Sequence, residues 1–205
     1  MKNVNLRGGN DLKPEKYSVT TSMQWFGDEI KTYAKVFAEL KDFKSVRKYL
    51  FDTNAFNGKS ESTAKDRIGK ISSRAEQLGA DGLALLIQAD YKDSNVLVLM
   101  SYLNRYRLAY EFVFEELAHR IDQYEPTVNA NEFENFYFQK QTLEPEQLKL
   151  TDATFKRIKS QVFNMLVHSG MLEVKSPGIY HLKRIVASEE LKEFLHASPY
   201  EAIIK

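Results

Sequence analysis

Histidine and carboxylate side chains are the first candidates for chemistry in this chain, but their spacing favours no reaction. The chain has four histidines: His119, His168, His181 and His196. They form no H-x-x-x-H pair, and no group of acidic residues stands beside them at the spacing of metal ligands. Glu115 and Glu116 are adjacent, so on a helix they point about 100° apart, which is typical of a solvated face. We therefore predict that the protein holds no metal or other cofactor and is not an enzyme.

Motifs that bind nucleotides or activate a nucleophile are missing as well. The sequence contains no G-x-S-x-G, no G-x-x-x-x-G-K-[ST] and no G-x-G-x-x-G motif. It has no cysteine, which excludes disulfides and thiol nucleophiles and suits a reducing cytoplasm. Its longest apolar run, residues 96–100, is far shorter than the roughly 20 residues of a membrane-spanning helix. We predict a cytoplasmic protein whose partners include neither a membrane nor a small-molecule substrate.

Charge is distributed unevenly along the chain, although the formal net charge is only +1. Residues 111–146 hold nine acidic residues against two basic ones, a local balance of −7. Residues 154–184 hold six basic residues against one acidic residue, a local balance of +5. A basic region of this kind is expected where a protein contacts a phosphate backbone. Attraction between the two regions of the chain is the alternative interpretation.

The helix predicted over residues 154–168 separates apolar from polar side chains. At about 100° per residue, one side gathers the apolar residues Phe155, Ile158, Val162, Met165 and Leu166. The opposite side gathers Arg157, Ser160, Gln161, Asn164 and His168. Such side chains offer the donors and acceptors that base edges recognise, and Lys156 and Lys159 flank them where phosphates would run. A merely solvated face would more often carry Glu and Lys.

A second basic helix is predicted to start at a cap on Ser60 or Ser62 and to end near Gly79. Its basic residues are Arg67, Lys70 and Arg74 along one stripe, with Lys59 and Lys65 near its start. The free amide groups at its N-terminus are a further place for a phosphate.

The elements that must position these residues are predicted to be mostly helices. Apolar residues recur at intervals of three or four from Tyr17 onward, and turn-forming residues separate the periodic stretches. Helices are predicted over about residues 17–40, 43–51, 60–78, 82–91, 95–105, 106–123, 130–140, 151–169 and 188–196. Residues 1–16, rich in Gly, Asn and Lys, are predicted to be a flexible tail.

The C-terminal section follows a different pattern. Thr151 caps its first helix and Gly170 ends it, and residues 171–175 and 179–183 then flank Ser176-Pro177-Gly178 as in a β-hairpin. This order is that of the end of a winged helix-turn-helix module, in which the helix reads a groove and the hairpin is the wing. A packing helix beside an edge hairpin is the alternative. We predict a helical domain over residues 17–145 and a C-terminal winged-helix-like subdomain over 146–205.

Residues 151–172, TDATFKRIKSQVFNMLVHSGML, resemble the C-terminal hallmark of the BrxA family. In that family a Ser/Thr-x-x-Thr start leads through a Lys/Arg-rich, Gln-Val-Phe-like centre to a Gly and an apolar pair. Other segments fall in the family's order: YSVTT at 17–21, STAK at 62–65, residues 102–114, YHLKRI at 180–185, and residues 190–195. The resemblance therefore spans nearly the whole chain.

This resemblance implies an accessory component of BREX, a bacterial system that modifies host DNA and blocks phage, with no catalytic role of its own. Members of the family are mostly α-helical, are compared with the antitermination factor NusB, and are thought to bind DNA. NusB itself binds RNA, so the comparison leaves both nucleic acids open.

The predicted fold is mostly α: a multi-helix NusB-like helical bundle with a C-terminal winged-helix-like helix plus a short β-hairpin. The predicted function is non-catalytic binding of nucleic acid, with double-stranded DNA favoured. The alternatives are RNA binding and a protein-protein adaptor whose acidic residues 111–146 dock another BREX protein. The residues predicted to contact nucleic acid are Lys59, Lys65, Arg67, Lys70, Arg74, Lys156, Arg157, Lys159, Gln161, Asn164, Lys183 and Arg184.

Overall fold

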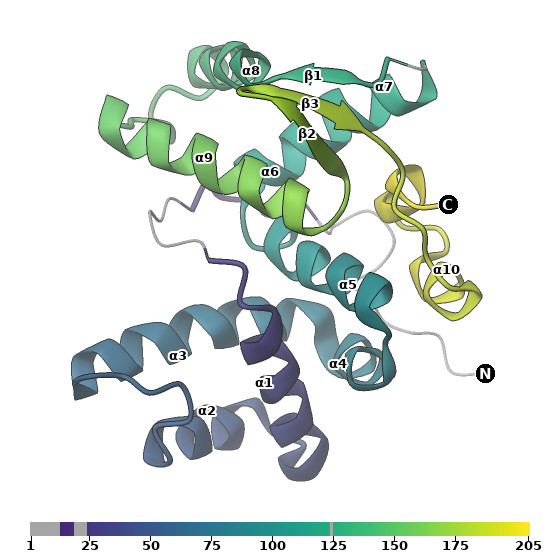
Figure 1. Cartoon of the computed structure of the whole chain (residues 1–205). Helices are drawn as coiled ribbons and strands as arrows, with labels where there is room; N and C mark the ends of the chain where they lie inside the picture. The colour runs from purple at the N-terminus through teal and green to yellow at the C-terminus, as the bar shows by residue number, and fades with distance from the viewer. Residues whose placement is uncertain (1–12, 19–23, 124) are drawn as a thin grey trace.

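The structure of the protein is a computed structural model that describes residues 13–18, 24–123 and 125–205. Most of the predicted tail, residues 1–12, lies outside these ranges. The described chain is mostly helical and carries one small three-stranded antiparallel sheet (Figure 1). The predicted mostly α fold with a C-terminal β-hairpin is thereby confirmed. Among the described residues, no helix combines the length and the apolar character needed to cross a membrane.

The first four helices pack together in the lower half of Figure 1. They are α1 (Gly27–Leu40), α2 (Phe43–Asp52), α3 (Glu61–Ala75) and α4 (Gly79–Gln88), with a 3-10 turn, η2 (Glu76–Leu78), before the last. Side-chain caps fix two of the starts, because Asp42 accepts from the amide of Ser45 and Ser60 from that of Thr63. Helix α1 begins at Gly27, after Phe26 in a left-handed conformation, which is later in the chain than predicted.

Helix α5 (Tyr91–Leu103) runs through the middle of the molecule and contacts elements of both halves (Figure 1). Every residue from Asn95 to Leu103 is buried. A helix that is covered on all sides is mostly apolar around its whole circumference, which explains the continuous apolar run at residues 96–100. Its start is earlier than predicted because Asp90 accepts a hydrogen bond from the amide of Asp93 at 2.8 Å and caps the helix.

The remaining helices lie in the upper half and at the side of Figure 1. Three segments follow one another directly: α6 (Arg107–Glu111), a π-helical stretch η3 (Phe112–Leu117) and α7 (Ala118–Asp122). They are followed by α8 (Ala130–Leu143), α9 (Asp152–His168), α10 (Glu189–Leu195) and a 3-10 helix, η4 (Pro199–Ile203). The π-helical stretch and η4 were not predicted.

The sheet contains β1 (Thr127–Asn129), β2 (Leu172–Ser176) and β3 (Ile179–Leu182) in the order β1-β3-β2. Strands β2 and β3 form the predicted hairpin, and Gly178 in its turn has a φ of 76°, a conformation that favours glycine. Strand β1 was not predicted. It pairs with β3 so that Val128 lies opposite Tyr180.

Aromatic side chains join α8, α9 and the sheet into one core. The ring centroids of Phe112 and Phe133 are 5.0 Å apart, and those of Phe163 and Tyr180 are 4.7 Å apart. The hydrophobic core contains residues on both sides of position 146. The domain boundary there, and the comparisons with NusB and with a winged helix, stay predictions.

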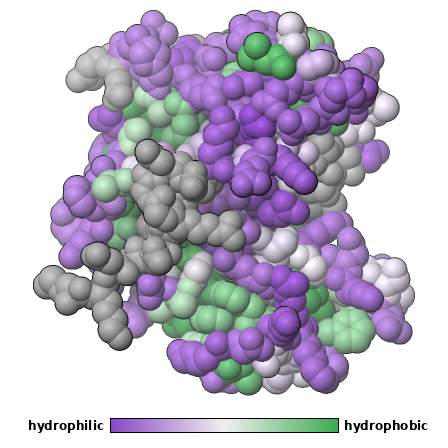
Figure 2. Space-filling model, turned by 180° about the vertical axis from the view of Figure 1, so that it is seen from behind, coloured by the Kyte–Doolittle hydropathy of each residue, from purple (hydrophilic) through white to green (hydrophobic). Residues whose placement is uncertain are grey.

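The surface seen from behind is largely hydrophilic (Figure 2). Hydrophobic surface gathers mainly in the lower half of that view, on the side of the molecule that holds α1 to α4. The large apolar side chains that are exposed come from several elements: Leu40, Tyr49, Tyr91, Phe138, Leu143, Val174, Ile179 and Val186.

Candidate nucleic-acid interface

Helix α9 is fixed in rotation by the apolar half of its sequence. Its buried residues are Phe155, Ile158, Val162, Phe163, Met165 and Leu166. The side chain of Thr151 accepts a hydrogen bond from the amide of Thr154 at 3.3 Å, and Gly170, with a φ of 81°, follows the end of the helix. Both ends agree with the prediction. Because the apolar stripe faces the core, the opposite side chains must face outward.

The outward face of α9 carries basic, amide and hydroxyl side chains. Arg157, Ser160 and Asn164 are exposed, and Lys156 is exposed at the flank. Neither Lys156 nor Arg157 forms an ion pair or a side-chain hydrogen bond with any residue in the described ranges. Their positive charges are therefore available to an external anion. Gln161, predicted to belong to the same face, is half-buried.

A stacked pair of rings marks the C-terminal end of this face. His168 of α9 lies against Trp25, which precedes α1, with 5.5 Å between ring centroids and an interplanar angle of 26°. The Nδ1 atom of His168 is 2.7 Å from the carbonyl oxygen of Asn164. Trp25 was not predicted to lie here, because nothing in the sequence relates a tryptophan to a helix more than a hundred positions later.

Lys159 was predicted to lie at the flank of the outward face, but its side chain turns inward towards α8. Its ammonium lies 2.9 Å from a carboxylate oxygen of Glu134 on α8, and its side chain is only 19% exposed. At this ion pair the alternative interpretation, attraction between the acidic and basic regions of the chain, holds. Lys159 therefore contributes less positive charge to the outer surface than Lys156 and Arg157 do.

The basic residues of the hairpin are partly engaged. The ammonium of Lys175 is 2.8 Å and that of Lys183 is 3.7 Å from the carboxylate of Glu173. Arg184 is half-buried, and its Nε donates to the carbonyl oxygen of Ala202 at 3.3 Å. Lys175 was not among the predicted contact residues, although it lies in the predicted hairpin and shares Glu173 with Lys183.

Arg74, predicted to lie on the outward stripe of α3, is instead fully buried, so this prediction was wrong. Its guanidinium donates to the carbonyl oxygen of Gln24 at 2.6 Å, to that of Val98 at 3.2 Å and to the hydroxyl of Ser101 at 3.2 Å. Burial lowers the pKa of Arg74 to about 10, which leaves the side chain charged at neutral pH. A side chain in this position joins α3 to α5 and cannot reach a ligand at the surface.

The other predicted residues of α3 keep only part of their exposed charge. Arg67 pairs with Glu29 at 2.6 Å and Lys70 with Asp66 at 2.5 Å. Lys59 and Lys65 are exposed and form no ion pair within the described part of the chain. The cationic surface of α3 is thus confined mainly to its N-terminal end and is weaker than predicted.

The acidic region is largely neutralised inside the molecule. Arg107 pairs with Glu144, Arg120 pairs with Glu132, and Lys140 lies 2.5 Å from Glu115. Since these charges are balanced locally, residues 111–146 present less negative surface than their composition indicates. The structure therefore does not strengthen the alternative in which this region docks an acidic face onto another protein.

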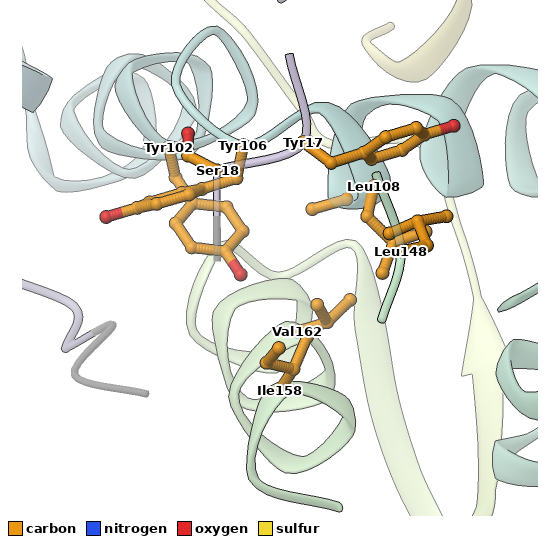
Figure 3. Close-up of a pocket in the computed structure, with 9 residues that line it drawn as sticks. Tyr17, Ser18, Tyr102, Tyr106, Leu108, Leu148, Ile158 and Val162 are labelled. Carbon is orange, nitrogen blue, oxygen red and sulfur yellow. The ribbon is translucent and has the colours of Figure 1, made fainter. Parts of the chain in front are cut away.

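A small pocket lies behind α9 (Figure 3). Its lining is mostly apolar and aromatic: Tyr17, Ser18, Tyr102, Tyr106, Leu108, Ala109, Leu148, Ile158 and Val162. Burial raises the pKa of Tyr102 and of Tyr106, so both phenols stay protonated. The pocket belongs to the packing between the N-terminal segment, the helices around residue 105, and the inner side of α9.

Comparison with protein families identifies a family for this chain. The family model described as BrxA matches residues 15–198, about nine-tenths of the chain. No curated protein is similar enough to the chain to match it.

Proposed function

Since this chain belongs to the BrxA family and is thereby a BREX-associated phage-defence protein, we propose that it is a non-catalytic component that binds double-stranded DNA through the outer face of α9. The observation that carries the proposal is the exposure of Lys156 and Arg157 without an internal anionic partner. An unpaired lysine or arginine binds a phosphate at little cost in free energy, because no ion pair has to be broken first.

The order of the elements around α9 supports a role in which this helix enters a groove of DNA. Helix α8 precedes it, the hairpin β2-β3 follows it, and β1 pairs with the hairpin (Figure 1). This is the order of elements in a winged helix-turn-helix module, where the second helix of the pair contacts base edges. In α9 the side chains at the corresponding surface are Arg157, Ser160 and Asn164, which have donors and acceptors for bases and phosphates.

The shape of the interface favours DNA over double-stranded RNA. The major groove of B-form DNA is wide enough to admit an α-helix, whereas the major groove of A-form RNA is deep and narrow. A helix such as α9, with its polar residues along one outward face, fits the wide groove. Competition between duplex DNA and structured RNA of equal length therefore separates the two nucleic acids.

The proposal is tested by titrating a fluorescent DNA duplex with the protein at about 50 and 200 mM salt. Binding should weaken steeply with salt, because each neutralised phosphate releases counterions. The double variant Lys156→Glu/Arg157→Glu should raise the Kd roughly 10- to 100-fold at the lower salt. It should also reduce the slope of log Kd against log salt concentration by the amount expected for the loss of about two phosphate contacts. Both side chains are exposed, so the thermal unfolding temperature should change little.

The matched control is Lys35→Glu/Lys44→Glu, which makes the same change of net charge on exposed positions of α1 and α2. Its Kd should stay within about a factor of three of the original protein, because only long-range electrostatics is altered. Equal weakening by both double variants would mean that net charge, and not α9, governs binding. Salt-independent binding would contradict the phosphate contacts themselves.

A further inference from the structure

The hairpin carries one carboxylate, Glu173, among its basic side chains. On β2, Lys175 lies where the pairing with β3 is irregular, between Val174 and Ser176, and its side chain turns to the side of Glu173, which it contacts. In the pairing of β2 with β3, Glu173 stands opposite His181, two positions before Lys183. The side chains of Glu173, Lys175 and Lys183 are each about half exposed, at 50%, 51% and 49%. The cluster therefore lies at the solvent-facing side of the hairpin.

The carboxylate of Glu173 engages both lysines. It lies 2.8 Å from the ammonium of Lys175 and 3.7 Å from that of Lys183. The hydrogen bond from Lys175 lowers the pKa of Glu173, so the carboxyl is ionised at neutral pH. The inner face of the hairpin is built differently, since Leu172 and Leu182 are buried there and Tyr180 stacks on Phe163 of α9.

We propose that Glu173 is an internal competitor of DNA phosphate, which occupies Lys175 and Lys183 in the free protein and limits the affinity of the hairpin for DNA. This inference rests on the proposed function. A carboxylate and a phosphate are both anionic acceptors for an ammonium group, so a carboxylate that pairs with a lysine neutralises part of the charge that would attract a phosphate. Because exposed pairs are weak, a phosphate displaces the carboxylate, but the displaced negative charge then stays beside the DNA and opposes binding.

The chain offers a clear contrast on α9. Lys156 and Arg157 have no carboxylate partner among the described residues, whereas the two hairpin lysines share one. Loss of the carboxylate of Glu173 should therefore strengthen the contribution of the hairpin to DNA binding, but not that of α9. Removing the charge of Glu173 adds positive potential chiefly at the hairpin and leaves the side chains of α9 themselves unchanged.

The test is the variant Glu173→Gln, titrated against the same duplex as the original protein at two salt concentrations. The Kd should fall about two- to five-fold at low salt, and the salt dependence should steepen by about one phosphate contact. The control Glu189→Gln makes the same charge change on α10, where Glu189 is 90% exposed and pairs with Lys192 at 2.7 Å. Its Kd should stay the same.

A second variant tests whether the gain in affinity of Glu173→Gln comes from the release of Lys175 and Lys183. In Glu173→Gln/Lys175→Gln/Lys183→Gln the gain in affinity should disappear, because the groups that were released are no longer there. An original protein that binds DNA while Glu173→Gln binds no more tightly, or while Glu189→Gln binds equally more tightly, overturns this inference alone. An original protein that binds no DNA overturns the proposed function and this inference with it.

Discussion

Replacing Arg74 by alanine is expected to lower the free energy of unfolding by about 3–5 kcal/mol, the range found when a large buried side chain is truncated. The guanidinium is fully buried, lies 5.4 Å from the ring centroid of Tyr102 and 5.8 Å from that of Phe26, and donates to two carbonyl groups. Alanine leaves a cavity between α3 and α5 and removes these donors. In a chain of this size the loss corresponds to a fall of roughly 10 °C in Tm.

Two further variants show which property of Arg74 matters. Methionine fills much of the same volume without a buried charge, so Arg74→Met should lose only about 1–2 kcal/mol. Lys65→Ala, on the exposed side of the same helix, should stay within about 0.5 kcal/mol of the original protein. Urea unfolding of the four proteins measures these differences. An Arg74→Ala protein that is as stable as the original but binds DNA more weakly would restore Arg74 as a surface contact.

The misplacement of Arg74 has a geometric cause. On a helical wheel it lies about 80° from the centre of the apolar stripe of α3, at the border between the two faces. A side chain as long as arginine can turn either way from such a position. It turns inward because Gln24, Val98 and Ser101 supply acceptors, and these residues belong to other segments of the chain. No pattern within α3 contains that information.

Residues of α9 could be placed correctly because their positions depend on the helix itself. Its apolar stripe has five members at helical spacing, and Arg157 and Asn164 lie opposite the middle of it. Lys159 was less predictable. It stands closer to the border of the stripe, and its inward position depends on Glu134 of α8.

The secondary structure likewise contains elements that depend on local sequence and elements that depend on distant partners. Caps and stops such as Ser60, Thr151 and Gly170 act on their own neighbours, and the helix ends that depend on them were predicted. Strand β1 has three residues and forms only because β3, some fifty positions later, pairs with it. The π-helical stretch η3 likewise has no local sequence signature. Structure that depends on distant partners was therefore missed.

Replacing Glu111 by glutamine is expected to be the second most damaging change, lowering the free energy of unfolding at pH 7 by about 3 kcal/mol. Its fully buried carboxylate accepts from the hydroxyl of Tyr17 at 2.6 Å and lies 2.6 Å from the ammonium of Lys13 and 2.8 Å from Nε of Arg107. Lys140 of α8 lies 3.3 Å away. Glutamine keeps the size of the side chain but leaves three cations without their shared anion.

The same residue gives the stability of the protein a defined dependence on pH. Burial alone raises the pKa of Glu111, but hydrogen bonds from Lys13, Tyr17 and Arg107 and the charge of Lys140 outweigh it and lower the pKa to about 2. A carboxyl whose pKa is lower in the folded than in the unfolded chain stabilises the fold fully above its ordinary value of 4.5. That stabilisation is lost as the pH falls from 4.5 towards 2.

The difference in unfolding free energy between the original protein and Glu111→Gln should therefore be largest near neutral pH and should shrink below pH 4.5. Urea titrations at a series of pH values measure it. Glu115→Gln is the matched control in the same cluster, because Glu115 is 43% exposed and pairs with Lys140 at 2.5 Å and with Lys13 at 3.5 Å. Its loss should stay below about 1 kcal/mol, as for other exposed pairs. A Glu111→Gln effect that is equally small, or that does not change with pH, would mean that this buried carboxylate does not hold the N-terminal segment against α6 and α8.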